Sequence, residues 1–263
     1  MAIAARPRLK PIALPAEHGG WGLVGAPILL GLLVAGSPAG VLLAGAALGA
    51  FLARQPLRLA ISDLSRGKRY PRTWWAMRFG LGFALVATAG FGFALAWSDH
   101  VFWPPLIGCV VLGSLQFRLD LKGRGHTLSG EILGALAMAP LATAIAMAGG
   151  VRRGVAFWLA LVLMMQSVNA LLYVRARLRL TRGDSIDPSP VWIGHALALL
   201  LVSVGVLGGH LGPWLALAFL VLLLRSAWGL SPWRRPVSAP IVGVQEVTYT
   251  LLTVLCAAAS FAG

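Results

Sequence analysis

Polar residues are few in this sequence, and they gather at the ends of long apolar stretches. The run Glu17-His18-Gly19-Gly20-Trp21 opens the first such stretch. A carboxylate and an imidazole beside two glycines could transfer a proton or contact a ligand where the backbone permits close approach. The alternative is membrane anchoring, with Trp21 in the aromatic belt and Glu17 at a helix N-terminus. Glu17 and His18 are therefore our candidate catalytic residues, although the sequence leaves open whether the protein is an enzyme.

Arginines at the ends of two other apolar stretches predict an anion site. Arg54 and Arg58 are four residues apart, so on a helix they share one face. Arg175 and Arg177 follow the sixth apolar stretch. Guanidinium groups can hold a phosphate or a carboxylate through paired hydrogen bonds. The alternative is that these side chains only reach toward the aqueous boundary.

Further polar side chains complete the predicted ligand site. Asn169 and Tyr173 are four residues apart within an apolar stretch and form a polar strip with Arg177. Glu131 lies just inside a predicted span, and we expect it to pair with a base, with Arg118, Lys122, Arg124 and His126 of the preceding loop as candidates.

Two more polar residues are expected inside the membrane. Glu246 is the deepest carboxylate of the last apolar stretch, and we expect it to pair with an arginine such as Arg78 or with His195. His195 itself could be a ligand contact, but a packed and hydrogen-bonded histidine is the favoured interpretation.

Composition identifies the class of protein that must position these residues. The chain has 263 residues, of which 58% are hydrophobic and 11% charged, whereas a soluble domain carries about 25% charged residues. The net charge of +14 does not indicate nucleic-acid binding, because the basic residues lie between apolar runs. Cys109 and Cys256 lie inside apolar segments, with no spacing that predicts a disulfide or a zinc site.

Nine apolar stretches predict an all-α polytopic membrane bundle. Residues 1–16 are expected to form a cytoplasmic tail, and residues 17–263 a single transmembrane domain with the lipid bilayer as a partner. The predicted spans are Trp21–Gly36, Gly40–Ala53, Trp74–Trp97, Val101–Phe117, Leu128–Gly149, Gly154–Val174, Val191–Gly209, Leu211–Leu224 and Pro240–Ala262.

Basic residues predict the orientation of these spans. With the N-terminus in the cytoplasm, all of the 22 Lys and Arg residues except Arg152 and Arg153 fall on the cytoplasmic side. The predicted location is the cytoplasmic (inner) membrane, with long cytoplasmic loops at Arg54–Thr73 and Arg175–Ser189. Long loops on one face are where function is expected.

The sequence lacks the motifs of several enzyme classes. It contains no P-loop, no HExxH and no GxSxG. It also has no run of acidic residues that could hold Mg²⁺, which prefers carboxylate oxygens. We therefore predict no metal site and identify no cofactor.

The E-H-G-G-W run, the nine spans and the arginine-rich second loop resemble the YwiC-like membrane proteins, whose hallmark is Q/E-H-G-x-W before the first helix. More distantly, the layout and the stretch K-G-R-G-H-T-L-S-G-E-I-L-G are similar to the UbiA superfamily of intramembrane prenyltransferases. That superfamily binds Mg²⁺-diphosphate through two Asp-rich motifs. Here their places hold R-Q-P-L-R-L-A-I-S-D, with Asp63 alone, and N-A-L-L-Y-V-R-A-R, with no carboxylate before Asp184 and Asp187.

These observations predict a UbiA-like bundle with a basic cavity on the cytoplasmic side. Its expected ligand is an anionic amphiphile: an isoprenoid phosphate, a quinone precursor or a lipid headgroup. UbiA-like prenyl transfer would follow if the resemblance extends to activity. The alternatives are a small-solute or ion transporter and a non-catalytic membrane assembly factor. Nothing in the sequence predicts the oligomeric state.

Overall fold

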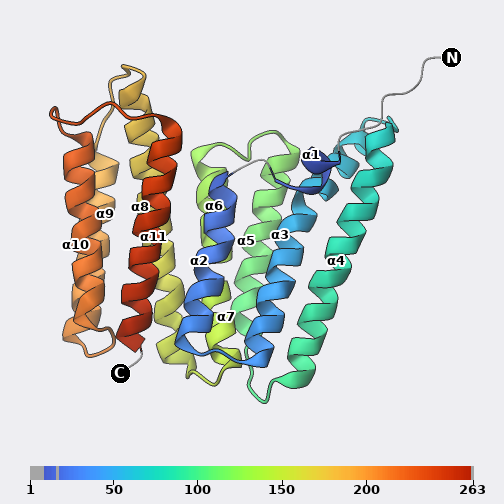
Figure 1. Ribbon diagram of the computed structural model, residues 1–263, viewed down its shortest axis with the longest axis horizontal. Coiled ribbons are helices and arrows are strands. Elements are labelled where there is room, and N and C mark those ends of the chain that lie inside the picture. Colours follow the sequence, from blue (N-terminus) through green and yellow to red (C-terminus); the bar gives the residue numbers. More distant parts are fainter. Residues whose placement is uncertain (1–8, 16–17, 262–263) are drawn as a thin grey trace.

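The computed structural model describes residues 9–15 and 18–261, and all regular secondary structure in these ranges is helical (Figure 1). The helices, in chain order, are α1 (Lys10–Ala13), α2 (His18–Val34), α3 (Pro38–Ser65), α4 (Pro71–Trp97), α5 (Pro104–Leu121), α6 (Leu128–Met138), α7 (Pro140–Ala148), α8 (Arg153–Thr181), α9 (Ser189–Leu207), α10 (Pro213–Leu230) and α11 (Ala239–Phe261).

Seven helical stretches of the described chain are long and apolar enough to cross a membrane. They are α3, α4, α6 together with α7, α8, α9, α10 and α11. α2 has 17 residues, and α5 has 18 residues that include Arg118 and Asp120 near its end. Both lie among the longer helices in the bundle (Figure 1). The chain is therefore a multi-pass integral membrane protein.

Prolines mark many of the helix boundaries. Pro38, Pro71, Pro104 and Pro213 each begin a helix, where the fixed φ suits the first turn and no amide hydrogen is needed. Pro140 divides the predicted span at Leu128–Gly149 into α6 and α7, because proline cannot donate to the carbonyl one turn earlier.

Successive connections alternate between the two ends of the bundle (Figure 1). The end drawn uppermost, which we call the basic end, holds the connections 66–70, 122–127, 182–188 and 231–238. The opposite end holds the connections 35–37, 98–103, 149–152 and 208–212. Among the described residues, Arg152 and Arg153 are the Lys and Arg residues of the opposite end.

The two long loops predicted at the basic end are wrong in extent. Helix α3 continues through Ser65 and α8 through Thr181, so most of Arg54–Thr73 and about half of Arg175–Ser189 are helical. A helix satisfies its own backbone in lipid and in water, and arginine, glutamine and leucine favour it. The change from apolar to charged residues therefore does not mark the end of either helix.

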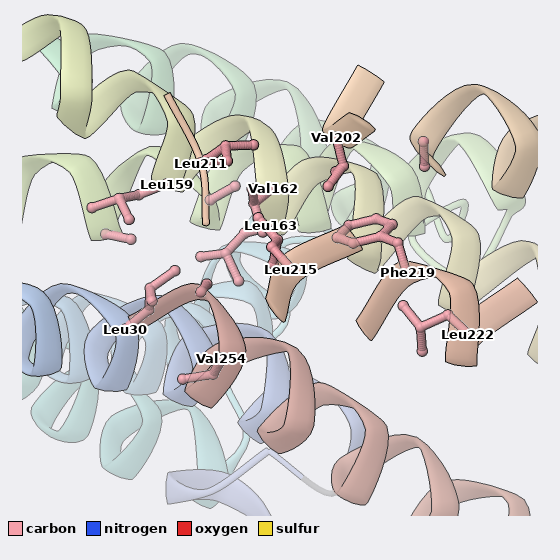
Figure 2. Close-up of a cluster of buried hydrophobic side chains, with 14 of the residues drawn as sticks. Leu30, Leu159, Val162, Leu163, Val202, Leu211, Leu215, Phe219, Leu222 and Val254 are labelled. Atoms are coloured by element: carbon pink, nitrogen blue, oxygen red, sulfur yellow. The ribbon is translucent and has the colours of Figure 1, made fainter. Parts of the chain in front are cut away.

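Two apolar clusters hold the bundle together. The larger joins α2 to α8, α9, α10 and α11 through buried side chains that include Leu30, Leu159, Val202, Phe219 and Val254 (Figure 2). The second joins α3, α4, α7 and the start of α8, around Leu43, Phe102 and Ile145. Since α2 contributes to the first cluster and packs against α7, it links the N-terminal helices to the C-terminal four.

Candidate functional site

A small recess opens where α2 begins, at the basic end. It is lined by Pro15, Gly20, Phe51, Arg54, Gln55 and Arg58. Gly20 and Trp21 both pack on Phe51 of α3. The Trp21 and Phe51 rings meet edge to face with centroids 5.3 Å apart, and a Cβ atom on Gly20 would lie 3.2 Å from the Phe51 ring. The Gly20-Trp21 pair thus fixes the first turn of α2 against α3.

The structure does not describe the polar side chains of the Glu17-His18-Gly19-Gly20-Trp21 run. Glu17 falls outside the described residues, and His18 begins α2 without a described side chain. Their proposed role in proton transfer therefore stays a prediction. Of this motif, Gly20 lines the recess together with Arg54 and Arg58.

Arg54 is joined to a buried carboxylate on α5. Its Nε and Nη2 atoms both lie 2.6 Å from Oδ2 of Asp120, whose side chain is 4% exposed. Gln116, one turn earlier on α5, donates to the other oxygen of Asp120 at 3.1 Å. Such a charge-assisted pair fixes the direction of the Arg54 side chain.

The loop after α5 is built around this carboxylate. A Cβ atom on Gly125 would lie 1.8 Å from Oδ1 of Asp120, and one on Gly130 would lie 2.5 Å from the carbonyl oxygen of Gly125. Only residues without a side chain fit at these two positions. The K-G-R-G-H stretch thus closes over Asp120 and supports the Arg54 pair.

Arg58 lies one helical turn beyond Arg54 and has a weaker partner. Its Nη2 atom donates to Oε1 of Gln55 at 2.9 Å. An amide oxygen carries no net charge, so the Arg58 guanidinium retains its full positive charge within the recess. The expected common face of Arg54 and Arg58 is confirmed by their shared recess.

The carboxylates at the places of the two Asp-rich motifs already have protein donors. Asp63 is 2% exposed and accepts hydrogen bonds from Arg72 through both oxygens and from Thr73. Asp184 pairs with Arg179 at 3.8 Å. Asp187 accepts the backbone N–H of Ser189, and hydrogen bonds from Ser189 lower the pKa of Asp187. Within the described ranges, no three acidic, histidine or cysteine side chains gather as a metal site would require.

Glu131 pairs with a base, as expected, and that base comes from across the bundle. Arg175 of α8 donates from Nε to Oε2 of Glu131 at 2.9 Å and from Nη2 to the carbonyl of His126 at 2.6 Å. Arg118, Lys122 and Arg124, the candidates in sequence, are exposed. The long reach of Arg175 allows α8 to supply the partner from the next layer of the bundle.

A second polar cluster lies among the four C-terminal helices. Arg225 of α10 forms an ion pair with Glu246 of α11, so the expected pairing with an arginine is confirmed, although the arginine is not Arg78. The Arg225 guanidinium also stacks over two rings, 4.0 Å from the centroid of Tyr173 and 5.0 Å from that of Tyr249. Arg78 instead lies over Trp74, at 4.2 Å.

The buried polar strip on α8 is confirmed. Asn169, Tyr173 and Arg177 are each no more than 5% exposed. Asn169 donates to the carbonyl of Gly194 at 3.2 Å. Arg177 donates to the carbonyls of Gly229 and Arg235, so it caps the C-terminal end of α10, where carbonyls lack helical partners.

His195 is packed and hydrogen-bonded, as the favoured interpretation expected. It is 2% exposed, with Nδ1 2.9 Å from the carbonyl of Val191 and Nε2 2.9 Å from the hydroxyl of Ser226. A carbonyl only accepts, so Nδ1 carries the proton.

Reasoning from the sequence missed Gln116, Asp120 and Arg225 as site residues. The predicted spans ended at Phe117 and Leu224, which placed Asp120 and Arg225 in loops. The four-residue spacing of Gln116 and Asp120 was the available signal, since it gives one polar helix face. The partner of Arg225 lies 21 residues away on another helix, and no local pattern identifies it.

Comparison with known proteins identifies a relationship for the N-terminal half. The sequence model of the family described as "YwiC-like protein" matches residues 14–146. The match runs from the residue before Pro15 nearly to the end of α7, so it contains the recess, Arg54, Asp120 and Glu131. Neither the search of curated proteins nor that of solved structures gave a match.

Proposed function

Since the chain belongs to the YwiC-like protein family and folds as a multi-pass membrane bundle, we propose that it binds an anionic amphiphile in the recess at the start of α2. The ligand classes are an isoprenoid phosphate, a quinone precursor and a phospholipid headgroup. Arg54 and Arg58 would meet the anionic group, while the apolar tail would lie along the lipid-facing helices. The description of the family names no activity, so the proposal rests on the geometry and charge of the recess.

The charge of the recess is the observation that carries this proposal. Two guanidiniums from consecutive turns of α3 lie on it, and its described lining contains no carboxylate. Asp120 compensates Arg54, whereas Arg58 meets only an amide oxygen. The first turn of α2 adds its own partial positive charge at Gly20. Among the described residues that line the recess, positive charge therefore exceeds negative charge, as an anion site requires.

The proposed topology places this recess on the cytoplasmic side. Nine spans follow if α2 and α5 cross the membrane with the seven longer stretches. The positive-inside rule then assigns the basic end to the cytoplasm and the N-terminus with it. The ligand would enter from the cytoplasmic leaflet of the inner membrane.

Whether chemistry follows binding depends on two residues that precede Gly20 in the sequence. Glu17 and His18 precede Gly20 by three and two positions, so they remain the candidates for proton transfer. Metal-dependent prenyl transfer of the UbiA kind would need carboxylate oxygens other than those of Asp63, which Arg72 and Thr73 engage. Direct capture by arginine is the better-supported mode of binding.

A thermal-shift experiment tests the proposal. The full chain in mild detergent would be heated with farnesyl phosphate, farnesyl diphosphate or dioctanoyl phosphatidylglycerol, each with Mg²⁺ and with EDTA. We expect stabilisation that does not depend on Mg²⁺ and that Arg58→Gln abolishes. Stabilisation only with Mg²⁺ would restore the prenyltransferase mode, and no stabilisation by any ligand would overturn the proposal.

A transporter is the second candidate, favoured by the buried cluster of the C-terminal helices. The Nε atom of Arg225, Oε2 of Glu246 and Oδ1 of Asn169 are buried without a hydrogen-bond partner. Paired charges inside a membrane bundle frequently mark an ion or proton pathway. Uptake or efflux by vesicles containing the protein, abolished by Glu246→Gln, would support transport. The third candidate, a non-catalytic assembly factor, predicts that Arg58→Lys changes nothing measurable.

A further inference from the structure

A second basic groove lies at the opposite end of the bundle, far from the recess in the fold. It is formed where the 98–103 connection meets the turn between α7 and α8. Its lining residues are His100, Val101, Met147, Gly150, Val151, Arg152 and Arg153.

The two arginines of this groove are unusual in their location. Arg152 and Arg153 are exposed, and the structure pairs neither of them with an acid among the described residues. Other described Lys and Arg residues belong to the basic end. Lys and Arg in short loops favour the cytoplasmic side, so these two oppose the orientation set by the rest of the chain. Their exposure and their lack of an acidic partner among the described residues make them candidates for binding an anion.

The local backbone adds to the positive potential. Helix α8 is 29 residues long and begins at Arg153, with no acidic residue in its first turn and no side-chain cap from Arg152. The amide hydrogens of Arg153 and Gly154 have no acceptor within the helix, and the helix dipole favours an anion near them. The N-terminus of α8 therefore adds positive potential to a groove that already contains the guanidinium groups of Arg152 and Arg153.

His100 is held over the same groove. Gly150 adopts a φ of +93°, and a Cβ atom there would lie 3.0 Å from Nε2 of His100. Ser98 accepts the backbone N–H of His100 at 3.2 Å. The turn at Gly150 thus leaves room for the imidazole ring beside Arg152 and Arg153, where it adds a hydrogen-bond donor.

Aromatic side chains place the groove at the depth of lipid headgroups. Trp97 ends α4, Trp103 precedes α5 and Trp214 lies in the first turn of α10. All three are exposed, Trp97 at 69%. Exposed tryptophans at helix ends mark the membrane interface. The phosphate of a phospholipid would lie at this level, and its chains would extend along the exposed side chain of Val101.

We propose that the groove lined by His100, Arg152 and Arg153 binds the phosphate group of an anionic phospholipid in the leaflet opposite the basic end. Two guanidinium groups, one imidazole N–H and the N-terminal amides of α8 would donate hydrogen bonds to a single phosphodiester. This site is independent of Arg54 and Arg58, and it holds whether or not the recess binds a ligand.

A lipid-binding titration in detergent tests this site apart from the other one. The full chain carrying Arg58→Gln would be titrated with dioctanoyl phosphatidylglycerol, dioctanoyl phosphatidylcholine and inorganic phosphate. We expect Arg152→Gln with Arg153→Gln to weaken phosphatidylglycerol binding by about tenfold or more, the loss expected for two charge-assisted contacts. Lys68→Gln with Arg69→Gln, which removes the same charge from exposed positions of the basic end, should leave binding unchanged.

Two results would overturn the proposal. Equal losses in the two double variants would show that only net charge matters. Inorganic phosphate binding as tightly as phosphatidylglycerol would identify a soluble anion as the ligand. Unchanged melting temperatures in both double variants would confirm that the comparison is between folded proteins.

Discussion

Arg54 of α3 and Asp120 of α5 form an ion pair 2.6 Å long at the edge of the α2 recess, with the carboxylate 4% exposed and the guanidinium 31% exposed. Asp120 is thus enclosed by protein, while Arg54 faces both the carboxylate and the recess. An anion that reaches Arg54 must share it with Asp120. Arg58 has no such competitor in the described chain and is the cation most available to a ligand.

Replacing Asp120 should separate stability from binding. Asp120→Asn removes the carboxylate and leaves Arg54 partly buried without a counter-charge, which should cost about 1–2 kcal/mol of unfolding free energy. It should also raise the affinity for an anionic amphiphile, since Arg54 no longer shares its charge. Melting temperature and ligand Kd measure the two effects, with the exposed Asp99→Asn as the control. A fall in affinity would show that Asp120 orients Arg54 for the ligand.

Gly125 should be intolerant of a side chain. In Gly125→Ala the new methyl group would meet Oδ1 of Asp120 at 1.8 Å, and we expect a loss of about 1–3 kcal/mol, as in overpacked sites. Gly113→Ala on α5 is the matched control, because a Cβ atom there has no neighbour within 4 Å and alanine favours the helix. Chemical unfolding in mixed micelles measures both. Equal stability of the two variants would contradict the close packing of the loop on Asp120.

Removing one partner of the buried Arg225–Glu246 ion pair should destabilise the protein, because the remaining charge has no counter-charge. Glu246→Gln leaves Arg225, whose side chain is 7% exposed, without a counter-charge, and we expect a loss of about 3–5 kcal/mol. The double variant Arg225→Met with Glu246→Leu should recover most of this loss, because no lone charge remains buried. Unfolding of the three proteins would be compared in one detergent. A double variant less stable than the single one would show that Tyr173 and Tyr249 depend on the guanidinium.

Labelling of single cysteines tests the proposed topology. With Cys109 and Cys256 replaced by serine, Lys68→Cys and Ser185→Cys at the basic end should resist a membrane-impermeant maleimide in intact cells. Asp99→Cys and His210→Cys at the opposite end should react. Disruption of the cells should make all four sites react. If the maleimide labelled both the Lys68→Cys variant and the Asp99→Cys variant in intact cells, the two ends of α4 would lie on the same side of the membrane. That result would contradict nine spans.

The fold was largely predictable because membrane spans are determined by local composition. Each predicted apolar stretch contains or overlaps a helix of the structure. Helix ends were harder, since α3 and α8 continue past the last apolar residue as ordinary amphipathic helices. Seven of the stretches in the described chain meet the length and apolarity of a span.

The sequence predicted which polar residues share a helix face, but not which residues pair between helices. Arg54, Arg58 and the Asn169–Tyr173–Arg177 strip follow from four-residue spacing, which any helix converts into a shared face. The partners Asp120, Arg175 and Arg225 come from helices distant in sequence, and their choice depends on how the bundle packs. Arg175 and Glu131 are 44 residues apart, a distance over which periodicity carries no information.

Affinity at Arg58 tests the central claim most directly. Farnesyl phosphate would be titrated, in EDTA, into the wild-type chain and into Arg58→Gln, Arg58→Lys and the exposed control Arg66→Gln, with melting temperatures measured in parallel. The proposal predicts that Arg58→Gln weakens binding by about tenfold or more. Arg58→Lys should recover only part of the loss, because an ammonium cannot donate two parallel hydrogen bonds to one phosphate. Arg66→Gln should bind as tightly as the wild type. Equal affinity in all four proteins would contradict the proposal, because the recess would then contribute nothing to the recognition of the anion.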